Sequence, residues 1–153
     1  MKGLDHMHSH CVYHRDIKPD NLLLSSPTSL AISDFGTATD ERQTEGIGAP
    51  SFQPPEVAAT GVAQASDKLD VWAAGITLFM MVTGRYPFRE GGTVYQMFEQ
   101  IAHERVVVPD TLPAELRDLL AGMLAPDPAQ RLCVRAVRKH AWLKQRVACI
   151  EYV

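Results

Sequence analysis

Between Val71 and Gly84 the chain runs for fourteen residues without a charged side chain. A run of this length is too short to span a bilayer comfortably, because a membrane helix needs about 20 apolar residues. The segment from Asp67 to Thr83 is apolar on most faces beyond Asp70, which predicts a helix that lies inside the protein. We therefore expect a domain whose other elements pack around this helix.

Length and composition fit a single globular domain. The chain has 153 residues, of which 46% are hydrophobic and 22% charged. A net charge of −3 gives no reason to expect a nucleic-acid or anionic-membrane partner. The first residues lack the apolar run of a signal peptide. The cysteines Cys11, Cys133 and Cys149 show no C-x-x-C spacing, which favours free thiols and a cytoplasmic or nuclear location.

Shorter elements are expected on both sides of the central helix. Residues 4–11 have the character of the last turns of a helix. Two apolar runs, 22–24 and 30–32, are separated by a polar turn and predict two short strands. Glycines and prolines between residues 34 and 56 predict a structured loop.

Three more helices are predicted after the central one. The first covers 93–103, and the second begins at Pro113. Their expected inner faces consist of Val94, Met97, Phe98 and Ile101, and of Leu116, Leu119, Leu120, Met123 and Leu124. The last helix is expected over Val134 to Leu143, with Trp142 as a core anchor.

Three short motifs follow one another in the first part of the chain. Residues 14–22 read His-Arg-Asp-Ile-Lys-Pro-Asp-Asn-Leu, Asp34-Phe35-Gly36 begins eighteen residues after Asp16, and Pro54-Pro55-Glu56 begins twenty residues later. Together with the Asp-Val-Trp-Ala-Ala-Gly run at 70–75 and Arg131, their order and spacing resemble the catalytic core of eukaryotic serine/threonine protein kinases. The resemblance extends from about Gly3 to Leu143.

This resemblance implies a fold and an activity. The fold is mainly α: a protein-kinase-like C-terminal lobe over residues 1–153, with short β-strands flanking the catalytic loop and an activation segment at 34–56. The activity is transfer of the ATP γ-phosphate to serine or threonine of protein substrates. No G-x-G-x-x-G loop precedes a strand. We therefore expect that the N-terminal lobe is absent, and that the chain alone does not turn over ATP at a useful rate.

Four residues carry the implied chemistry. Asp16 matches the residue that orients the substrate hydroxyl and accepts its proton. Lys18 matches the cation beside the transferring phosphate of ATP and marks the serine/threonine branch. Asn21 and Asp34 match the two Mg²⁺ ligands, hard oxygen donors suited to a hard cation.

Five further residues are implied to support the site. His14 packs within its loop, and Arg15 is placed to pair with a phosphate on the activation segment. Asp70 should accept hydrogen bonds from the catalytic-loop backbone. Glu56 should pair with Arg131 in a largely desolvated ion pair, which would be costly to break.

Three stretches narrow the resemblance: residues 48–56, 70–78 and 83–88. They are most similar to the polarity and tumour-suppressor kinase upstream of the AMP-activated protein kinase. That resemblance implies two partners, a pseudokinase and a scaffold adaptor, and activity without activation-loop phosphorylation. Ala49 departs from the family pattern, because a threonine or serine hydroxyl there bridges the residues matching Asp16 and Lys18. Reduced activity is therefore expected.

A different class of function stays open, that of a non-catalytic interaction module. It would bind kinase partners or substrates, and the apolar residues Leu23 and Phe35 are expected to be exposed. Metal binding by His6 and His10, or phosphorylation of Thr37, Thr39 or Thr44, are weaker alternatives to packing and to solvated loop side chains. Met80 and Met81 are expected to fill the core. A basic helix face is expected at Arg135, Arg138, Lys139, Lys144 and Arg146.

Overall fold

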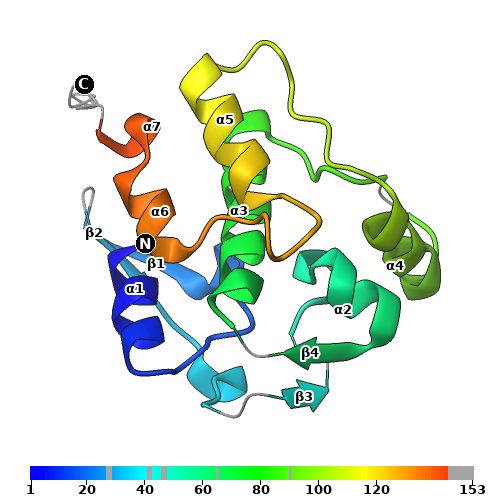
Figure 1. Ribbon diagram of the computed structural model, residues 1–153, viewed down its shortest axis with the longest axis horizontal. Helices are drawn as coiled ribbons and strands as arrows, with labels where there is room; N and C mark the ends of the chain where they lie inside the picture. Colours follow the sequence, from blue (N-terminus) through cyan, green and yellow to red (C-terminus); the bar gives the residue numbers. More distant parts are fainter. Residues whose placement is uncertain (27–28, 41–42, 46–47, 65, 90, 145–153) are drawn as a thin grey trace.

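The computed structural model describes residues 1–26, 29–40, 43–45, 48–64, 66–89 and 91–144. These residues form a mostly helical protein with two small two-stranded sheets (Figure 1). The helices and strands are α1 (Lys2–Ser9), β1 (Leu22–Ser26), β2 (Ser29–Ile32), β3 (Gln43–Glu45), α2 (Pro55–Thr60), β4 (Val62–Gln64), α3 (Asp67–Thr83), α4 (Val94–His103), α5 (Ala114–Met123), α6 (Val134–Lys139) and α7 (Ala141–Lys144).

Helix α3 is the central element, with the predicted bounds of Asp67 and Thr83. It contributes Val71 and Ala73 to one buried apolar cluster, and Trp72, Ile76 and Phe79 to another. Its apolar residues therefore face the core on more than one side, as its sequence predicts. Figure 1 shows α5 beside it, with α1 and α6 on one flank and α4 on the other.

The expectation for Met80 and Met81 is half right. Met80 packs against the second apolar cluster, but the Met81 side chain is 58% exposed. Met81 instead lines a shallow apolar pocket of about 170 Å³ together with Leu30 and Ile32 of the β1–β2 ribbon. The last turns of α3 thus have one partly exposed face at Met81.

Helix α5 presents the predicted inner face: its four predicted apolar residues and Leu124, directly after the helix, are buried as expected. Helix α4 follows the prediction less closely. Ile101 is fully buried and Met97 and Phe98 pack against the core, but Val94 is 52% exposed. Burial increases toward the C-terminal end of α4, because only that end reaches the second apolar cluster.

The single helix predicted over Val134 to Leu143 is wrong, since α6 and α7 are separated at His140. The backbone of His140 is extended there, with φ −62° and ψ 145°. Its ring contacts Asp118 through Nε2 at 3.0 Å and accepts a hydrogen bond from the Trp142 N–H at 3.3 Å. The His140 ring therefore caps the start of α7, and the half-buried Trp142 packs against both apolar clusters.

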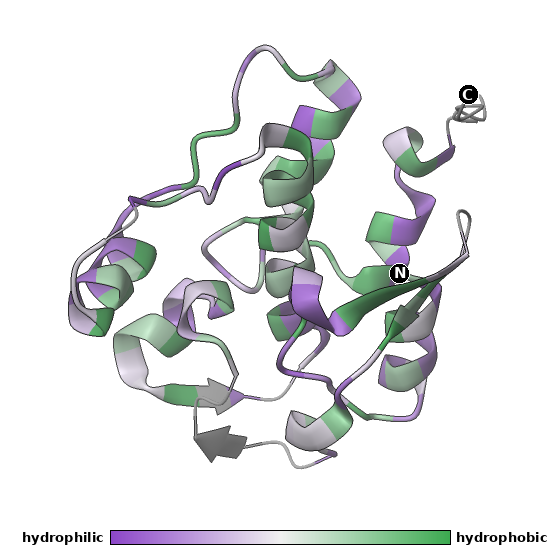
Figure 2. Ribbon diagram, turned by 180° about the vertical axis from the view of Figure 1, so that it is seen from behind, coloured by the Kyte–Doolittle hydropathy of each residue, from purple (hydrophilic) through white to green (hydrophobic). Residues whose placement is uncertain are grey.

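The two predicted strands form the antiparallel β1–β2 ribbon, in which Leu22 pairs with Ile32 and Leu24 with Leu30. In the described part of the segment 34–56, helix α2 begins at Pro55, and the strand pair β3–β4 was not predicted. Figure 2 shows that the β1–β2 ribbon is hydrophobic over the part nearer the rest of the protein, whereas serines form the end near its turn. Among the described residues no helix has the length and apolar character needed to cross a membrane.

Candidate functional site

Asp70, in the first turn of α3, accepts hydrogen bonds from the backbone of the loop between α1 and β1. Asp70 has no exposed surface. Its Oδ2 accepts the backbone N–H of His14 at 2.9 Å, and its Oδ1 accepts the N–H of Arg15 at 2.8 Å. The contact expected between Asp70 and the loop backbone is therefore present, and it fixes the loop against the central helix.

His8 also holds this carboxylate, a contact that the sequence reasoning missed. Its Nε2 lies 2.8 Å from Asp70 Oδ2, and its side chain is only 6% exposed. The available signal was the helical spacing: His8 lies four residues after the buried Leu4, so both side chains lie on the same face of α1.

His14 connects three parts of the site and is fully buried. Its Nε2 faces the Ser33 carbonyl oxygen at 2.9 Å, and its Nδ1 faces the Asp16 N–H at 3.3 Å. A carbonyl can only accept and a backbone N–H can only donate, so these partners select the neutral ring with its proton on Nε2. The His14 ring packs 5.2 Å from the Phe35 ring. His14 is thus a structural member of the site, as expected.

Arg15 and Asp34 both have left-handed backbone conformations, with φ 66° and φ 61°. Such conformations are uncommon for residues other than glycine and persist where surrounding contacts impose them. Arg15 is fixed by Asp70 at its backbone, and its Nε donates to the Thr37 carbonyl oxygen at 2.7 Å. The Thr37 hydroxyl donates to the His14 carbonyl oxygen at 2.8 Å, which ties the 34–56 segment to the loop.

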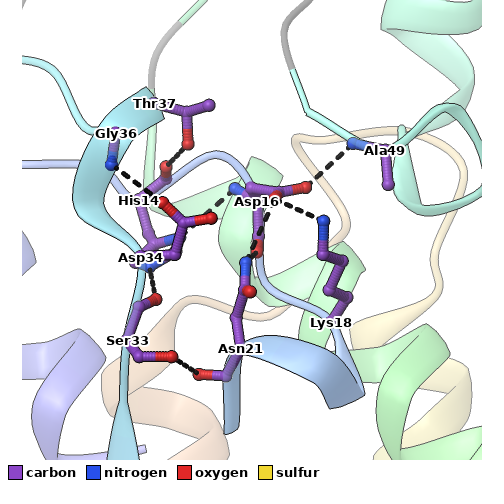
Figure 3. A network of polar contacts seen from close by, with 9 residues as sticks. All are labelled: His14, Asp16, Lys18, Asn21, Ser33, Asp34, Gly36, Thr37 and Ala49. Carbon is purple, nitrogen blue, oxygen red and sulfur yellow. Dashed lines mark hydrogen bonds and ion pairs between the residues drawn. The ribbon is translucent and has the colours of Figure 1, made fainter.

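Three donors converge on the Asp16 carboxylate (Figure 3). Lys18 Nζ donates to Oδ2 at 2.7 Å, and the Asn21 amide nitrogen donates to the same oxygen at 3.0 Å. The backbone N–H of Ala49 donates to Oδ1 at 2.8 Å. Asp16 is only 7% exposed, so these donors take the place of water around a buried carboxylate.

Burial and these donors oppose one another at Asp16. Burial by itself would raise the pKa of its carboxyl group. The hydrogen bonds from Lys18, Ala49 and Asn21, together with the Lys18 charge, outweigh burial and lower the pKa below its ordinary value of 3.8. The hydrogen bond to Asp16 raises the pKa of Lys18, and the nearby charges of Asp16, Asp20 and Asp34 add to that effect. Asp16 and Lys18 therefore form a charged pair at neutral pH.

Asn21 and Asp34 bring oxygen atoms to the same region from two neighbouring segments (Figure 3). Asn21 uses its amide N–H groups on the Asp16 backbone oxygen and Oδ2, which leaves its amide oxygen for another ligand. Asp34 is exposed, and its carboxylate accepts only the Gly36 N–H, at 3.3 Å, among the described residues. Within the described ranges, His, Cys, Asp and Glu side chains form no group of three that could hold a metal ion.

Gly48 allows the 34–56 segment to approach the loop. Its φ is 100°, and a Cβ atom there would lie 2.4 Å from the Arg15 carbonyl oxygen. Only glycine fits such a position without displacement of the backbone. The next residue, Ala49, can therefore donate its backbone N–H to Asp16. Ala49, the residue that departs from the family pattern, thus still contacts this carboxylate through its backbone.

Glu56 and Arg131 form the ion pair expected from the sequence, well away from Asp16. Both pairs of atoms, Nη1 with Oε1 and Nη2 with Oε2, are separated by 2.8 Å. Arg131 also donates to the carbonyl oxygens of Ala125, Lys68 and Pro126, and its side chain is fully buried. Glu56 keeps 29% of its side chain exposed, so the pair is desolvated on the arginine side only.

The remaining histidine and threonine candidates from the sequence are His6, His10, Thr39 and Thr44. The rings of His6 and His10 are 4.6 Å apart on the surface of α1. Thr39 pairs with Tyr13 in an isolated backbone bridge, and the side chain of Thr44 lies outside the described residues, as do Cys149 and Arg146.

Comparison with known proteins identifies the family. The family model described as the protein kinase domain matches residues 1–143. The chain is 40% identical over 151 residues to serine/threonine-protein kinase STK11 of Homo sapiens, an alignment that covers 94% of this chain and 35% of the relative. It is 38% identical over 146 residues to serine/threonine-protein kinase GRIK1 of Arabidopsis thaliana, which covers 92% of this chain and 36% of the relative.

The chain spans about a third of the length of these curated relatives. A third relative, the serine/threonine-protein kinase stk11 homolog of Dictyostelium discoideum, is 35% identical over 160 residues and matches 100% of this chain. The family match includes every residue of the network around Asp16, Asp70 and Arg131. The chain therefore belongs to the protein kinase family.

Proposed function

We propose that this chain is the C-terminal lobe of a serine/threonine protein kinase that transfers the γ-phosphate of ATP to protein substrates. The observation that carries this proposal is the convergence of Lys18, Asn21 and the Ala49 N–H on the Asp16 carboxylate. Phosphoryl transfer needs positioned charges more than covalent chemistry, because its transition state is loose. A carboxylate held by three donors is a positioned charge of this kind.

Asp16 is proposed to accept a hydrogen bond from the substrate hydroxyl and to orient it toward the phosphate. Its lowered pKa keeps it ionised at neutral pH, which suits an orienting acceptor. Lys18 is proposed to contact the transferring phosphate, since its ammonium lies beside Asp16 and within the field of Asp34. It would offset the negative charge that builds up around the phosphate.

Asn21 and Asp34 are proposed to hold Mg²⁺ together with the phosphates of ATP. The residues present fit this ion, since the Asn21 amide oxygen and the Asp34 carboxylate are hard oxygen donors. Magnesium sites in such enzymes use one or two protein oxygens, while phosphate and water complete the coordination. The lack of a three-residue cluster in the described ranges is therefore compatible with this role. Bound Mg²⁺ would neutralise phosphate charge.

Phosphate transfer tests the proposal directly. Because the chain spans about a third of the human relative, it is joined to the part of STK11 that precedes the match. Transfer of labelled phosphate from ATP to a protein substrate is then measured for the parent chimera and for Asp16→Asn. Loss of the orienting carboxylate should lower the rate by about 10²-fold or more.

The matched control is Asp40→Asn in the 34–56 segment. Asp40 is exposed, and its side chain makes no hydrogen bond or ion pair with the described residues. Its replacement should leave the rate within about twofold. Equal rates for the parent and Asp16→Asn, at equal melting temperature, would exclude Asp16 from the reaction and refute the proposed site.

A second candidate function, an interaction module, is favoured by the exposed apolar residues near the site. Leu23 and Phe35 are each 53% exposed, as expected from the sequence, and Leu24 is 75% exposed. Such a patch marks an interaction surface or an aggregation hazard. This candidate predicts that the chain binds an intact kinase or its substrate, and that Asp16→Asn leaves that binding unchanged while Leu24→Glu weakens it. A pull-down with both variants separates the two functions.

The cellular setting is also proposed. Protein substrates, a pseudokinase and a scaffold adaptor are the partners that the resemblance implies, and a cytoplasmic or nuclear location agrees with the free thiols of Cys11 and Cys133. Co-purification of the chimera with such partners from cells, followed by mass spectrometry, tests the partner assignment.

A further inference from the structure

A pocket opens beside the C-terminal end of α3, far along the chain from the Asp16 network. It has a volume of about 380 Å³, large enough for one amino-acid side chain with its neighbouring backbone. Its apolar lining includes Phe79, Tyr86, Phe88 and Val107, and two arginines, Arg85 and Arg89, complete it. The site proposed for phosphoryl transfer uses none of these residues.

The apolar part of the pocket is held in place before any ligand binds. Phe79 and Phe88 belong to the second apolar cluster and are 1% and 6% exposed. The Tyr86 ring lies 5.7 Å from the Phe88 ring, and its hydroxyl donates to the Ser51 carbonyl oxygen. A lining that is already ordered loses little conformational freedom when a ligand enters, which favours binding.

The entrance of the pocket combines positive charge with exposed apolar surface. Arg85 and Arg89 are exposed, and their side chains have no ion pair or hydrogen bond with the described residues. Val107 is 80% exposed on the segment that follows α4. The whole chain carries a net charge of −3, so two arginines that lack a partner among the described residues give this pocket a charge opposite to that of the chain.

Arg89 also lines a second hollow of about 560 Å³, whose other lining residues are Gly91, Gly92, Gln96, Glu99 and Gln100. The Glu99 carboxylate lies 3.8 Å from the His103 ring, so this acidic group has a partner of its own. Gly91 has no heavy atom within 4 Å of the position where a Cβ would stand. This wall therefore lets an extended backbone pass close to the surface. The two hollows share Arg89, and we call the two together the groove.

We propose that this groove binds an acidic segment of a partner protein. The groove consists of Arg85 to Arg89, Gly91, Gly92 and Val107. One apolar side chain of that segment enters the pocket against Tyr86 and Phe88, and flanking carboxylates pair with Arg85 and Arg89. Charge complementarity selects an acidic segment, and the preformed apolar pocket supplies an anchor of the kind found at binding hot spots. An anionic membrane fits less well, because a flat surface cannot fill a pocket of this depth.

The test uses the full 153-residue chain and a fluorescein-labelled peptide with one phenylalanine flanked on each side by glutamates. Fluorescence anisotropy measures binding at low and high salt. We expect saturable binding that weakens with salt. The double variant Arg85→Glu, Arg89→Glu should weaken it about tenfold or more, since two attractive charge pairs become repulsive. A second variant, Val107→Asp, places a carboxylate at the entrance and should weaken binding too.

The matched control carries the same change of charge elsewhere, at Lys139→Glu and Lys144→Glu on α6 and α7, and should bind like the parent. Thermal melting shows that each variant is folded. Equal affinity of the arginine variant and the lysine control would overturn the proposal. So would equal binding of a peptide with alanine in place of phenylalanine, since the pocket would then be unused. If phosphatidylserine vesicles capture the chain and the peptide does not bind, the groove binds a membrane surface and the proposal is wrong.

Discussion

The Asp16 carboxylate accepts three hydrogen bonds, from two different parts of the chain. Lys18 and Asn21 reach it from its own loop, and Ala49 reaches it from the 34–56 segment. The carboxylate is therefore both oriented and kept ionised. In the proposed reaction it would align the substrate hydroxyl, and it would take up the proton only as the bond to phosphorus forms.

The lowered pKa of Asp16 predicts a pH dependence of stability. A carboxyl group whose folded pKa lies below its unfolded value of about 3.8 stabilises the fold above that pH. This stabilisation is lost as the pH falls through the folded value. We expect the difference in melting temperature between the parent and Asp16→Asn to be constant at neutral pH and to shrink below about pH 3.8. Parallel curves for the parent and Asp16→Asn down to about pH 2 would contradict the lowered pKa.

Ala49 predicts a gain of activity on substitution. Its backbone already donates to Asp16, but alanine offers no hydroxyl to bridge Asp16 and Lys18. In the chimera, Ala49→Ser should raise the rate of phosphate transfer by up to about tenfold, because one added hydrogen bond contributes about 1 kcal/mol. Ala49→Val adds volume without a hydroxyl and should give no gain. Equal rates for the serine variant and the parent would show that the bridge is not needed.

Motif spacing predicted the side chains of the site better than it predicted their contacts. Asp16, Lys18 and Asn21 lie in one short loop, so their proximity follows from the sequence. The Ala49 N–H belongs to every residue type except proline, and no pattern of letters singles it out. Placing it beside Asp16 depends on Gly48, whose φ of 100° allows the close approach to Arg15.

At the scale of elements, Arg131 connects three parts of the protein: α2, the start of α3 and the loop after α5. It pairs with Glu56 of α2, and it donates to carbonyl oxygens of Lys68 in α3 and of Ala125 and Pro126 after α5. All five N–H groups of the guanidinium are thereby used. The guanidinium also lies 5.0 Å from the centre of the Trp72 ring.

Arg131→Ala should therefore destabilise the fold by about 3–5 kcal/mol, because it leaves Glu56 and three carbonyl oxygens without their donor. A change of that size lowers the melting temperature by roughly 10 °C in a protein of this length. The control is Arg117→Ala, which removes an exposed pair with Asp110 and should change it little. Calorimetry on both variants gives the comparison, and an unchanged melting temperature for Arg131→Ala would refute this role.

The long apolar helix α3 and the short β1–β2 ribbon were predictable, but the break between α6 and α7 and the β3–β4 pair were not. Helix α3 has the predicted bounds, because a segment that is apolar on most of its faces is expected to form a buried helix. The break between α6 and α7 depends on the His140 ring, which bonds Asp118 of α5 and caps α7. The β3–β4 pair depends on two segments that meet only after folding. Contacts of this kind are tertiary, so local patterns carry no signal for them.

At the scale of the whole molecule, segments distant in sequence are brought to one place by α3. The loop after α1 rests on Asp70 of α3, the turn after β2 contributes Asp34, and the end of the 34–56 segment contributes Ala49. The apolar ribbon β1–β2 lies on one side of this site and leaves Leu23 and Leu24 exposed. The groove beside Arg85 and Arg89 lies near the other end of α3. The fold thus separates a proposed chemical site from a proposed docking surface.

The account depends most on Asn21 and Asp34 acting as one metal site, and binding of Mn²⁺ with a non-transferable ATP analogue measures this directly. Mn²⁺ replaces Mg²⁺ at oxygen ligands, and electron paramagnetic resonance counts the free ion. In the chimera, Asn21→Ala or Asp34→Asn should weaken nucleotide-dependent Mn²⁺ binding by about tenfold or more, and the exposed control Asp40→Asn should not. Binding that is unchanged in both site variants would contradict the proposed phosphoryl-transfer site.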